Sequence, residues 1–319
     1  MKRYILYALA ILLIVIIAFL SYLSFLLPNV GPAPDLTVEI TPERVARGDY
    51  LANHVMLCMD CHAQRDFTIY AGPPKPGTEG AGGEAFDQSM GFPGVFFSRN
   101  ITPSGIGDWT DGELFRAITT GVSKDGSALF PVMPYLLYGQ LDEEDIISVI
   151  AYIRQLKPVE SPNIPSKPDF PFNFIINTIP KKANLSKRPD PTDQIAYGKY
   201  LITAASCGEC HTNQKDGKVI GEPYAGGFEF QFPHGPIVRS SNITPHETGL
   251  ASWTKEQFVQ RFKMHVDSNY VAPNVGRDDF QTVMPWLMYA GMKDEDLEAI
   301  YAYLRTVAPV DNFVERYTD

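Results

Sequence analysis

The chain has 319 residues, of which 27 are Lys or Arg and 37 are Asp or Glu, so its formal net charge is −10. An acidic surface repels nucleic acid and anionic lipid headgroups, and it favours solubility or docking to a basic protein. With six histidines and no Gly-rich phosphate-binding loop, the sequence also argues against a hydrolase or a kinase.

The first predicted element is a transmembrane helix over residues 4–27. These residues carry no charge, and about 20 apolar residues suffice to cross a bilayer core as a helix. Because Lys2 and Arg3 precede them, the positive-inside tendency places the N-terminus in the cytoplasm and the rest of the chain outside it. A cleaved signal peptide is the alternative, but the run exceeds the usual apolar length of about 7–15 residues, and no A-x-A-like site follows it.

A second helix is predicted over residues 41–58, because a threonine that can cap it and a proline suited to its first turn stand at its start. Gly48 lies inside this helix, where glycine costs about 1 kcal/mol relative to alanine. Gly198 occupies the matching place in a similar helix of the second half. The repeated glycine predicts that another helix crosses there at close range, with Tyr152 or Tyr303 as the contact.

A cysteine motif follows this helix. Cys58-Met59-Asp60-Cys61-His62 returns as Cys207-Gly208-Glu209-Cys210-His211, and the two copies use all four cysteines. C-x-x-C-H is the attachment signature of c-type haem, in which two thiols bond the porphyrin and the histidine ligates iron. One copy alone would leave a thioredoxin-like redox pair or half of a zinc site open. Two copies predict two haem c groups, with thioethers at Cys58, Cys61, Cys207 and Cys210 and proximal iron ligands at His62 and His211.

Each half of the chain predicts two further helices. Thr110-x-x-Glu113 and Thr254-x-x-Gln257 are capping boxes that begin a middle helix. Acidic residues at 142–145 and 294–296 favour the start of a closing helix. The apolar residues of 146–153 recur at helical spacing, so this closing helix is expected to bury one face.

A low-spin electron carrier needs a second axial ligand, and Met133 and Met284 are the candidates. Both stand in matched Val-Met-Pro contexts, and proline biases the residue before it away from helix, so each thioether can reach a haem from a loop. Methionine is more often core filler than ligand, but the duplication favours ligation. The alternative distal ligands are Met90 in the first half and Met264, Met288 or His265 in the second. His265 is the strongest of these. Three histidines without a duplicated counterpart are expected in loops or at the surface, namely His54, His234 and His246.

Secondary roles at the haems are predicted for three more pairs. The N–H groups that could bond a haem propionate are those of Trp109, Trp253, Asn100 and Asn242, with core packing as the alternative for the tryptophans. A carbonyl is expected to accept the second N–H of each proximal histidine. Pro73 and Pro223 are the candidates for this carbonyl.

Residues 158–191 separate the two halves and contain eight prolines. This composition disfavours helix and favours an extended, stiff chain. The apolar segment 170–176 within it is predicted to pack across the seam between the halves and to fix one haem relative to the other. The alternative is an exposed patch that docks a partner.

The chain is therefore an internal duplication, and two tandem all-α domains are predicted, over 41–157 and 192–310. Two long repeats indicate a duplicated domain and not a solenoid, which needs several shorter units. The matched segments, beyond the haem motifs, are 46–51 with 196–201, 100–103 with 242–245, 109–110 with 253–254, 132–134 with 283–285, and 151–154 with 302–305.

These matched motifs resemble a known family. Asn-Ile-Thr-Pro, the following Trp-Thr, the Met-Pro-aromatic and the closing Ala-Tyr-(Ile/Leu)-Arg are similar to those of the multihaem cytochrome c subunits of membrane-bound alcohol and gluconate dehydrogenases. The resemblance covers about residues 41–310 and implies two class I cytochrome c domains, with Met133 and Met284 as distal ligands. The chain departs from that family in having two haem motifs where three are usual, and in an N-terminal anchor.

An electron-transfer protein, and not an enzyme, is the function predicted. Two c-type haems would relay single electrons from a dehydrogenase or another respiratory donor towards a terminal oxidase or a soluble cytochrome. The haem domains are expected on the periplasmic side of a bacterial cytoplasmic membrane, where covalent attachment of haem c takes place. The alternative is a dihaem peroxidase, which needs an open sixth site at one haem, and the paired Met-Pro segments argue against it.

Overall fold

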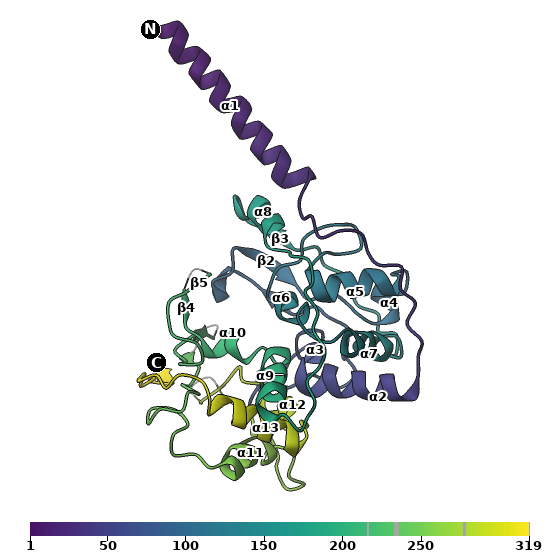
Figure 1. The fold of residues 1–319 in the computed structure, drawn as a ribbon, viewed down its shortest axis with the longest axis vertical. Helices are drawn as coiled ribbons and strands as arrows, with labels where there is room; N and C mark the ends of the chain where they lie inside the picture. The colour runs from purple at the N-terminus through teal and green to yellow at the C-terminus, as the bar shows by residue number, and fades with distance from the viewer. Residues whose placement is uncertain (216, 233–235, 277–278, 319) are drawn as a thin grey trace.

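The computed structural model describes residues 1–319 except 216, 233–235, 277–278 and 319. Helix α1 (Lys2–Phe25) projects alone from the rest of the molecule, which consists of two helical halves (Figure 1). α1 is apolar and long enough to cross a membrane, with a mean hydropathy of 2.8. Its side chains are almost all exposed, so the fold itself does not need them for a core.

One helix pair forms the centre of each half. In the first half, α2 (Pro42–Tyr50) continues into the π-helical turn η1 (Leu51–Val55) and packs against α7 (Glu143–Ile153). In the second half, α9 (Gln194–Ala204) packs against α13 (Asp294–Leu304). These helices bury one continuous apolar core, which includes Leu51, Ile146, Ile150, Leu201 and Leu297.

Both helix pairs cross at the repeated glycine. A Cβ added to Gly48 would lie 1.9 Å from the carbonyl oxygen of Ser148, and a Cβ added to Gly198 would lie 1.9 Å from that of Ala299. The predicted close crossing is therefore confirmed. The backbone of the closing helix comes nearest to each glycine. Tyr152 is a contact of Gly48 as predicted, through its Cβ at 2.8 Å, whereas Tyr303 is not among the nearest atoms at Gly198.

The remaining helices of the two halves are short. Thr110 and Thr254 begin α5 and α11 with complete capping boxes, as the sequence predicts. The bounds are α3 (Cys58–Cys61), α4 (Pro103–Ile106), α5 (Asp111–Thr120) and α6 (Tyr135–Tyr138) in the first half, and α10 (Cys207–His211), α11 (Lys255–Lys263) and α12 (Trp286–Tyr289) in the second. A 3₁₀ turn, η2 (Gln88–Met90), precedes β2.

Three small antiparallel sheets correct the prediction of an all-α chain. The strands are β1 (Ala85–Phe86), β2 (Gly94–Phe97), β3 (Lys167–Pro168), β4 (Gln214–Lys215), β5 (Lys218–Val219), β6 (Glu229–Gln231), β7 (Ile237–Arg239) and β8 (Tyr317–Thr318). They pair in the orders β1-β2-β3, β4-β5 and β6-β7-β8. Strands of two to four residues are too short to carry an alternating pattern, so periodicity could not reveal them.

The Pro-rich segment packs on the first half. It contains α8 (Phe172–Ile175) and the 3₁₀ turn η3 (Ile176–Thr178), and the Phe172 ring lies 5.7 Å from that of Phe130. Ile176 is buried in the same small cluster, with Phe86 and Phe96. The prediction that this segment packs across the seam is wrong, because Phe172 and Ile176 pack into a cluster of the first half and Phe170 is exposed.

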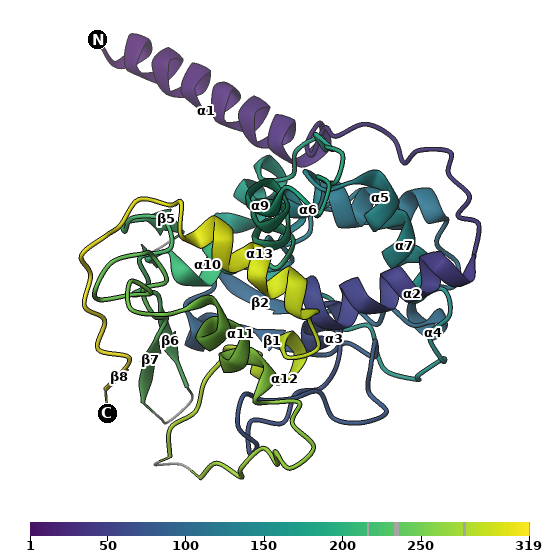
Figure 2. The same cartoon turned by 60° about the horizontal axis from the view of Figure 1, so that its bottom comes forward.

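Two reciprocal hydrogen bonds hold the seam instead. The Tyr50 hydroxyl donates to Asp296 at 2.5 Å, and the Tyr200 hydroxyl donates to Asp145 at 2.7 Å. Each tyrosine belongs to the first helix of one half and each carboxylate to the first turn of the closing helix of the other. The two halves therefore meet through equivalent surfaces, and Figure 2 shows α12 and α13 beside α2 and α3.

Two loops extend the seam. The amide of Val275 donates to the Thr68 carbonyl at 2.8 Å, and the amide of Tyr70 donates to the Pro273 carbonyl at 2.9 Å. The Gln281 side chain donates to the carbonyls of two residues in the same first-half loop. Backbone pairing of this kind fixes the relative position of the two halves.

Candidate haem-binding site

Both C-x-x-C-H helices begin after a strained residue. Leu57 and Ser206, which precede the first cysteine of each motif, have φ of 54°. This left-handed conformation costs a non-glycine residue roughly 1–2 kcal/mol. The strain recurs at the same place in both halves, where the chain turns sharply from the preceding helix into α3 or α10.

Backbone carbonyls orient the two histidine rings. His62 Nδ1 lies 2.7 Å from the Arg99 carbonyl oxygen, and His211 Nδ1 lies 2.7 Å from that of Ser241. A carbonyl can only accept, so each Nδ1 must carry the proton, and each Nε2 keeps a lone pair for iron. Burial lowers the pKa of both imidazoles, although these hydrogen bonds oppose it, and so favours the neutral form that binds a metal.

The predicted carbonyls of Pro73 and Pro223 do not make these contacts. The acceptors belong instead to the residues just before the two Asn-Ile-Thr-Pro motifs, Arg99 and Ser241. The prediction placed the two acceptors too close to the histidines along the chain, because each acceptor lies one loop further on. The Asn-Ile-Thr-Pro repeat was the sequence signal that could have identified the Arg99 and Ser241 carbonyls.

An Ala-Gly-Gly turn makes a hydrogen bond to the main-chain carbonyl of each histidine, and the sequence did not predict this contact. The amide of Gly82 donates to the His62 carbonyl at 3.1 Å, and the amide of Gly226 donates to the His211 carbonyl at 2.8 Å. Gly82 and Gly226 have φ of 67° and 74°. An added Cβ on Gly82 would lie 2.5 Å from the Arg99 carbonyl carbon. Only glycine fits there, and the repeated tripeptide at 81–83 and 225–227 was the available signal.

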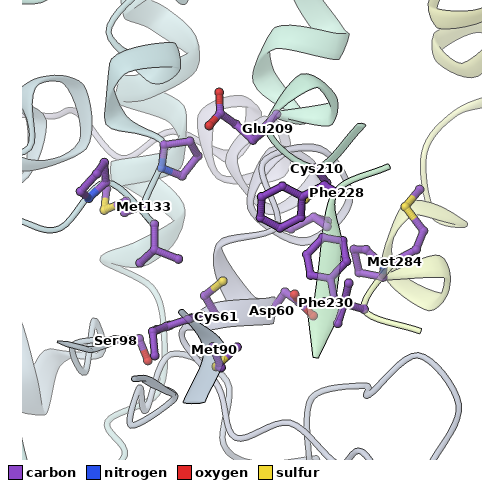
Figure 3. A pocket seen from close by; sticks show the side chains of 18 of the residues that line it. Asp60, Cys61, Met90, Ser98, Met133, Glu209, Cys210, Phe228, Phe230 and Met284 are labelled. Atoms are coloured by element: carbon purple, nitrogen blue, oxygen red, sulfur yellow. The ribbon is translucent and has the colours of Figure 1, made fainter. Parts of the chain in front are cut away.

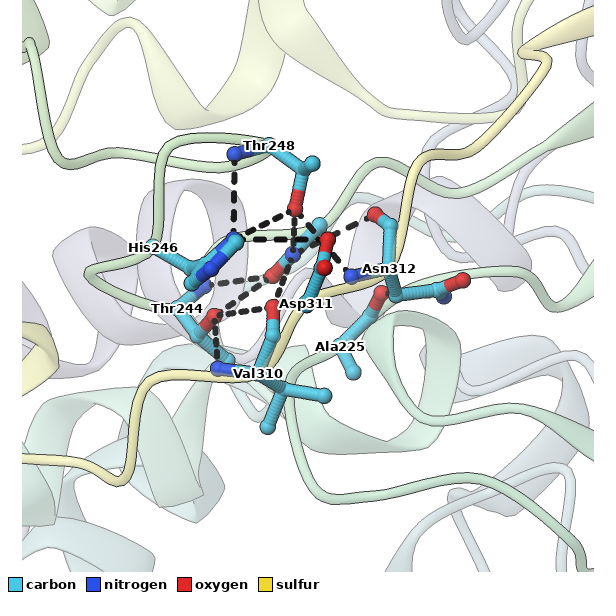
Figure 4. A network of polar contacts seen from close by, with 8 residues as sticks. Ala225, Thr244, His246, Thr248, Val310, Asp311 and Asn312 are labelled. Atoms are coloured by element: carbon cyan, nitrogen blue, oxygen red, sulfur yellow. Dashed lines mark hydrogen bonds and ion pairs between the residues drawn. The ribbon is translucent and has the colours of Figure 1, made fainter.

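The two asparagines have a structural role that contradicts the propionate prediction. The side-chain oxygen of Asn242 accepts from the amide and the hydroxyl of Thr244, and its Nδ2 donates to the Val310 carbonyl at 2.9 Å (Figure 4). Asn100 repeats this pattern, with Nδ2 donating to Val159 at 2.8 Å. Their amides tie the loop after the histidine acceptor to the chain after the closing helix.

A large cavity of about 2760 Å³ adjoins both motifs. Typical drug-sized pockets span about 300–1,000 Å³, so this cavity has room for more than one large flat ligand. Both cysteine pairs, both proximal histidines, Met133 and Met284 line it, and Figure 3 shows the two methionines on separate parts of its wall. The two predicted donor sets therefore face one space.

The rival distal ligands are less well placed. His265 is buried between Tyr70 and Trp286, with its Nδ1 3.1 Å from the Phe262 carbonyl oxygen. Among the described residues that line the cavity, His265, Met264 and Met288 do not appear, whereas Met90 does. Ligation by His265 would require it to leave its aromatic stack.

The histidines without counterparts lie outside the cavity where the structure describes them. His54 Nδ1 lies 2.9 Å from the Met288 carbonyl oxygen in the seam, and His246 contacts Thr248 at 3.0 Å. The His54 prediction of a surface or loop position is wrong, because this residue is in the helical turn η1 at the seam. His234 falls outside the described residues.

The four thiols do not have the character of a redox pair or a zinc site. Burial raises the pKa of Cys58, Cys61 and Cys207 to about 12 and that of Cys210 to about 11. Thioredoxin-like cysteines need a lowered pKa, because the thiolate is the reactive form. The part of the chain that the structure describes also contains no cluster of three or more His, Cys, Asp and Glu that could hold a metal. The donor set instead fits haem c.

Aromatic and ionic groups complete the cavity wall. The Phe96 and Phe130 rings stack at 3.9 Å, and both tryptophans of the repeat, Trp109 and Trp253, line the cavity. Arg65 bridges Asp60 at 2.9 Å and Glu84 at 3.3 Å. Burial, partly offset by Arg65, raises the pKa of Asp60 to about 6, and one of its carboxylate oxygens has no partner in the described structure.

The fold and this cavity define the class of protein. Residues 195–308 match the family model of cytochrome c, so this part of the chain is a cytochrome c domain. Covalent attachment of haem c is the property of such a domain, and it agrees with the C-x-x-C-H motif at the start of α10.

Relatives that match most of the chain are named as cytochrome subunits or as a c-type cytochrome. The chain is 31% identical to the fructose dehydrogenase cytochrome subunit of Gluconobacter japonicus over 82% of its own length and 52% of the relative. It is 29% identical to the cytochrome c subunit of the quinone alcohol dehydrogenase of Gluconacetobacter polyoxogenes, over 86% and 58%. It is 27% identical to a dihaem c-type cytochrome of Cereibacter sphaeroides, over 80% and 83%.

The chain thus resembles the cytochrome c subunits of alcohol, fructose and gluconate dehydrogenases, as its motifs predict. It spans only about half the length of the curated dehydrogenase subunits that it matches.

Proposed function

We propose that this protein is a dihaem electron carrier that relays single electrons on the extracytoplasmic side of a membrane. The observation that carries the proposal is the pair of complete donor sets facing one cavity. Bound haem would supply the one-electron chemistry at iron, and the chain's own residues attach, orient and enclose it.

Each residue of the donor sets has a defined role in this proposal. The thiols of Cys58 and Cys61 attach one haem, and those of Cys207 and Cys210 attach the other. His62 and His211 offer Nε2 to iron because their Nδ1 protons are committed to backbone carbonyls. Met133 and Met284 provide the distal thioethers, and His/Met ligation raises the potential.

The seam supports transfer between the two haems. The proposed haem units are residues 41–157 and 192–310, joined by 158–191, and equivalent helices of the two units meet through Tyr50–Asp296 and Tyr200–Asp145. Electron tunnelling falls steeply with distance, so a fixed spacing keeps its rate constant. Paired hydrogen bonds and loop pairing supply that fixed spacing.

Membrane anchoring through α1 is the second part of the proposal. The helix is apolar and exposed, and its first turn carries the positive charges of Lys2 and Arg3, which favours a cytoplasmic N-terminus and periplasmic haem units. The proposed donor is a dehydrogenase catalytic subunit, because the similar proteins are named as dehydrogenase cytochrome subunits. A respiratory oxidase or a soluble cytochrome is the proposed acceptor.

A coulometric titration of the purified chain tests the proposal. The expected result is reversible uptake of two electrons per chain, in two one-electron steps, without any substrate. Uptake of one electron, or a requirement for a bound substrate, would contradict it. Stopped-flow mixing of the reduced chain with hydrogen peroxide is the companion test, in which rapid saturable oxidation would identify a peroxidase instead.

A further inference from the structure

Residues 170–175, here called the α8 segment, lie against the C-terminal end of α1. Asn177, in the turn that follows α8, donates a side-chain hydrogen bond to the Leu23 carbonyl at 3.1 Å. Leu23 is the one buried residue of α1, at 7% exposed. Figure 1 shows α8 next to the end of α1 that meets the rest of the molecule. The segment is therefore placed where a membrane-spanning α1 would leave the bilayer.

Large apolar side chains of this region point into solvent. Phe170 is 82% exposed and Ile175 is 45% exposed, while Phe25 at the end of α1 is 83% exposed. The Phe170 ring makes an edge contact with that of Phe174 at 6.4 Å. Single exposed apolar residues are common on proteins, but these lie together at the end of an apolar helix. Aromatic rings in such positions are typical of the membrane–water interface.

The protein holds this segment rigidly on the wall of the cavity. Phe172 packs its ring at 6.4 Å from Phe96 and at 5.7 Å from Phe130, and all three line the cavity. The amide of Asp169 also donates to the Pro93 carbonyl at 2.9 Å, next to the pairing of β3 with β2. The α8 segment therefore has a fixed position relative to the first C-x-x-C-H motif. A surface that binds this segment is held at the same fixed position.

The charge nearby also suits a lipid surface. Lys181 and Lys182 are exposed and follow η3 by three residues, in a chain whose net charge is −10. Basic residues beside interfacial aromatics attract anionic headgroups. A catalytic subunit could also cover Phe170, but the contact with α1 favours lipid, because α1 brings the bilayer to this place.

We propose that the α8 segment, residues 170–175, is a second membrane contact that rests in the lipid interface beside α1 and turns the first haem unit towards the bilayer. The proposal rests on the proposed role of α1 as anchor. Two contacts, one spanning and one interfacial, would stop the haem units from tumbling about the end of α1. The first unit is then the membrane-proximal one, and the second unit is free for a partner in the aqueous phase.

Site-directed spin labelling of the full chain in vesicles of phosphatidylcholine and phosphatidylglycerol tests this. The native cysteines carry haem in the mature protein, so Phe170→Cys introduces the one free thiol for a nitroxide. The control is Val271→Cys, since Val271 is 84% exposed, lies in the second half and is not among the described residues that line the cavity. Ile175→Cys gives a second position within the segment.

Collision with two relaxation agents reports the depth of each label. Accessibility to a water-soluble nickel chelate should be several-fold lower at position 170 than at 271, and accessibility to oxygen several-fold higher. Equal nickel accessibility at both positions, with the chain sedimenting with the vesicles, would overturn the interfacial contact. Exclusion of both agents at 170 would also overturn it, because that pattern indicates a protein contact. Failure to sediment at all would instead refute the anchor role of α1.

Discussion

At the residue scale, the two histidines are oriented by main-chain oxygens, and this explains a difference between the repeats. Arg99 and Ser241 occupy equivalent places although their side chains have little in common. Because only the carbonyl accepts the Nδ1 proton, the side chain there is free to vary. The Ala-Gly-Gly turns, by contrast, admit no Cβ where they pass the acceptor loop.

Substitution of the distal methionines is the first prediction at this scale. Met133→Ala and Met284→Ala should each remove the long-wavelength absorption of a ferric haem–methionine bond at one haem and lower its potential, because the thioether stabilises ferrous iron. Absorption spectra and a redox titration of each variant measure both effects. His265→Ala is the control and should leave the band intact. If Met284→Ala leaves the band and the potential of the second haem unchanged, while His265→Ala makes that haem high-spin, the second haem has two histidine ligands.

The sequence nominates residues with chemistry of their own, but it does not identify residues that act through the backbone. C-x-x-C-H and Val-Met-Pro can be proposed as donors because their side chains are able to bind haem or iron. The Arg99 and Ser241 carbonyls cannot, because any residue supplies a carbonyl and only the fold selects which one. The predicted partner of Asn100 and Asn242 was wrong for a related reason, since an amide N–H can donate equally well to a haem propionate and to a backbone carbonyl.

At the scale of elements, helices that begin with clear caps were predictable, and strands were not. Thr110 and Thr254 cap their helices as expected, because a capping box is a local interaction. The strands depend on distant partners, as when the chain after the closing helix supplies β3 to β2. The apolar segment at 170–176 was recognised as packed, but its partner was not, because hydrophobicity does not specify which surface a segment covers.

The helix crossing gives the prediction at this scale. Gly48→Ala should destabilise the protein by about 1–3 kcal/mol, because its Cβ would overlap the Ser148 carbonyl and force the helices apart. Urea unfolding measures this free energy. An uncrowded helical glycine would give the opposite sign, since alanine is the better helix former by about 1 kcal/mol. A stabilised variant would therefore contradict the close crossing, and Gly198→Ala repeats the test in the second half.

At the scale of the whole molecule, the seam converts two similar units into one body. Asp145 is a buried carboxylate at this seam, where it pairs with Arg47 at 2.8 Å and Arg188 at 2.6 Å and accepts from Tyr200. Burial disfavours its charge, but hydrogen bonds and the nearby arginines outweigh burial and lower its pKa. The ionised carboxylate of Asp145 is therefore more stable in the folded protein than in the unfolded chain.

A dependence on pH follows from that direction. A lowered pKa in the folded state stabilises the protein above the unfolded pKa of about 3.9 and loses this effect as the pH falls further. Asp145→Asn should thus lower the free energy of unfolding by about 3 kcal/mol at neutral pH, because it leaves a mostly buried arginine without its carboxylate. This loss should become progressively smaller below about pH 4. Unfolding free energies of variant and wild type across pH 3–7 measure the difference. The exposed-site control Glu247→Gln should differ little throughout, and a constant cost for Asp145→Asn would contradict the ionic account.

The count of covalently bound haems tests the central claim most directly. Intact mass spectrometry of the chain, matured with the cytochrome c assembly system and denatured, should show two haem additions that survive acid–acetone extraction. The Cys58→Ala, Cys61→Ala double variant should show one addition and retain the spectrum of the second unit. A mature wild-type chain with one addition or none would contradict the dihaem account.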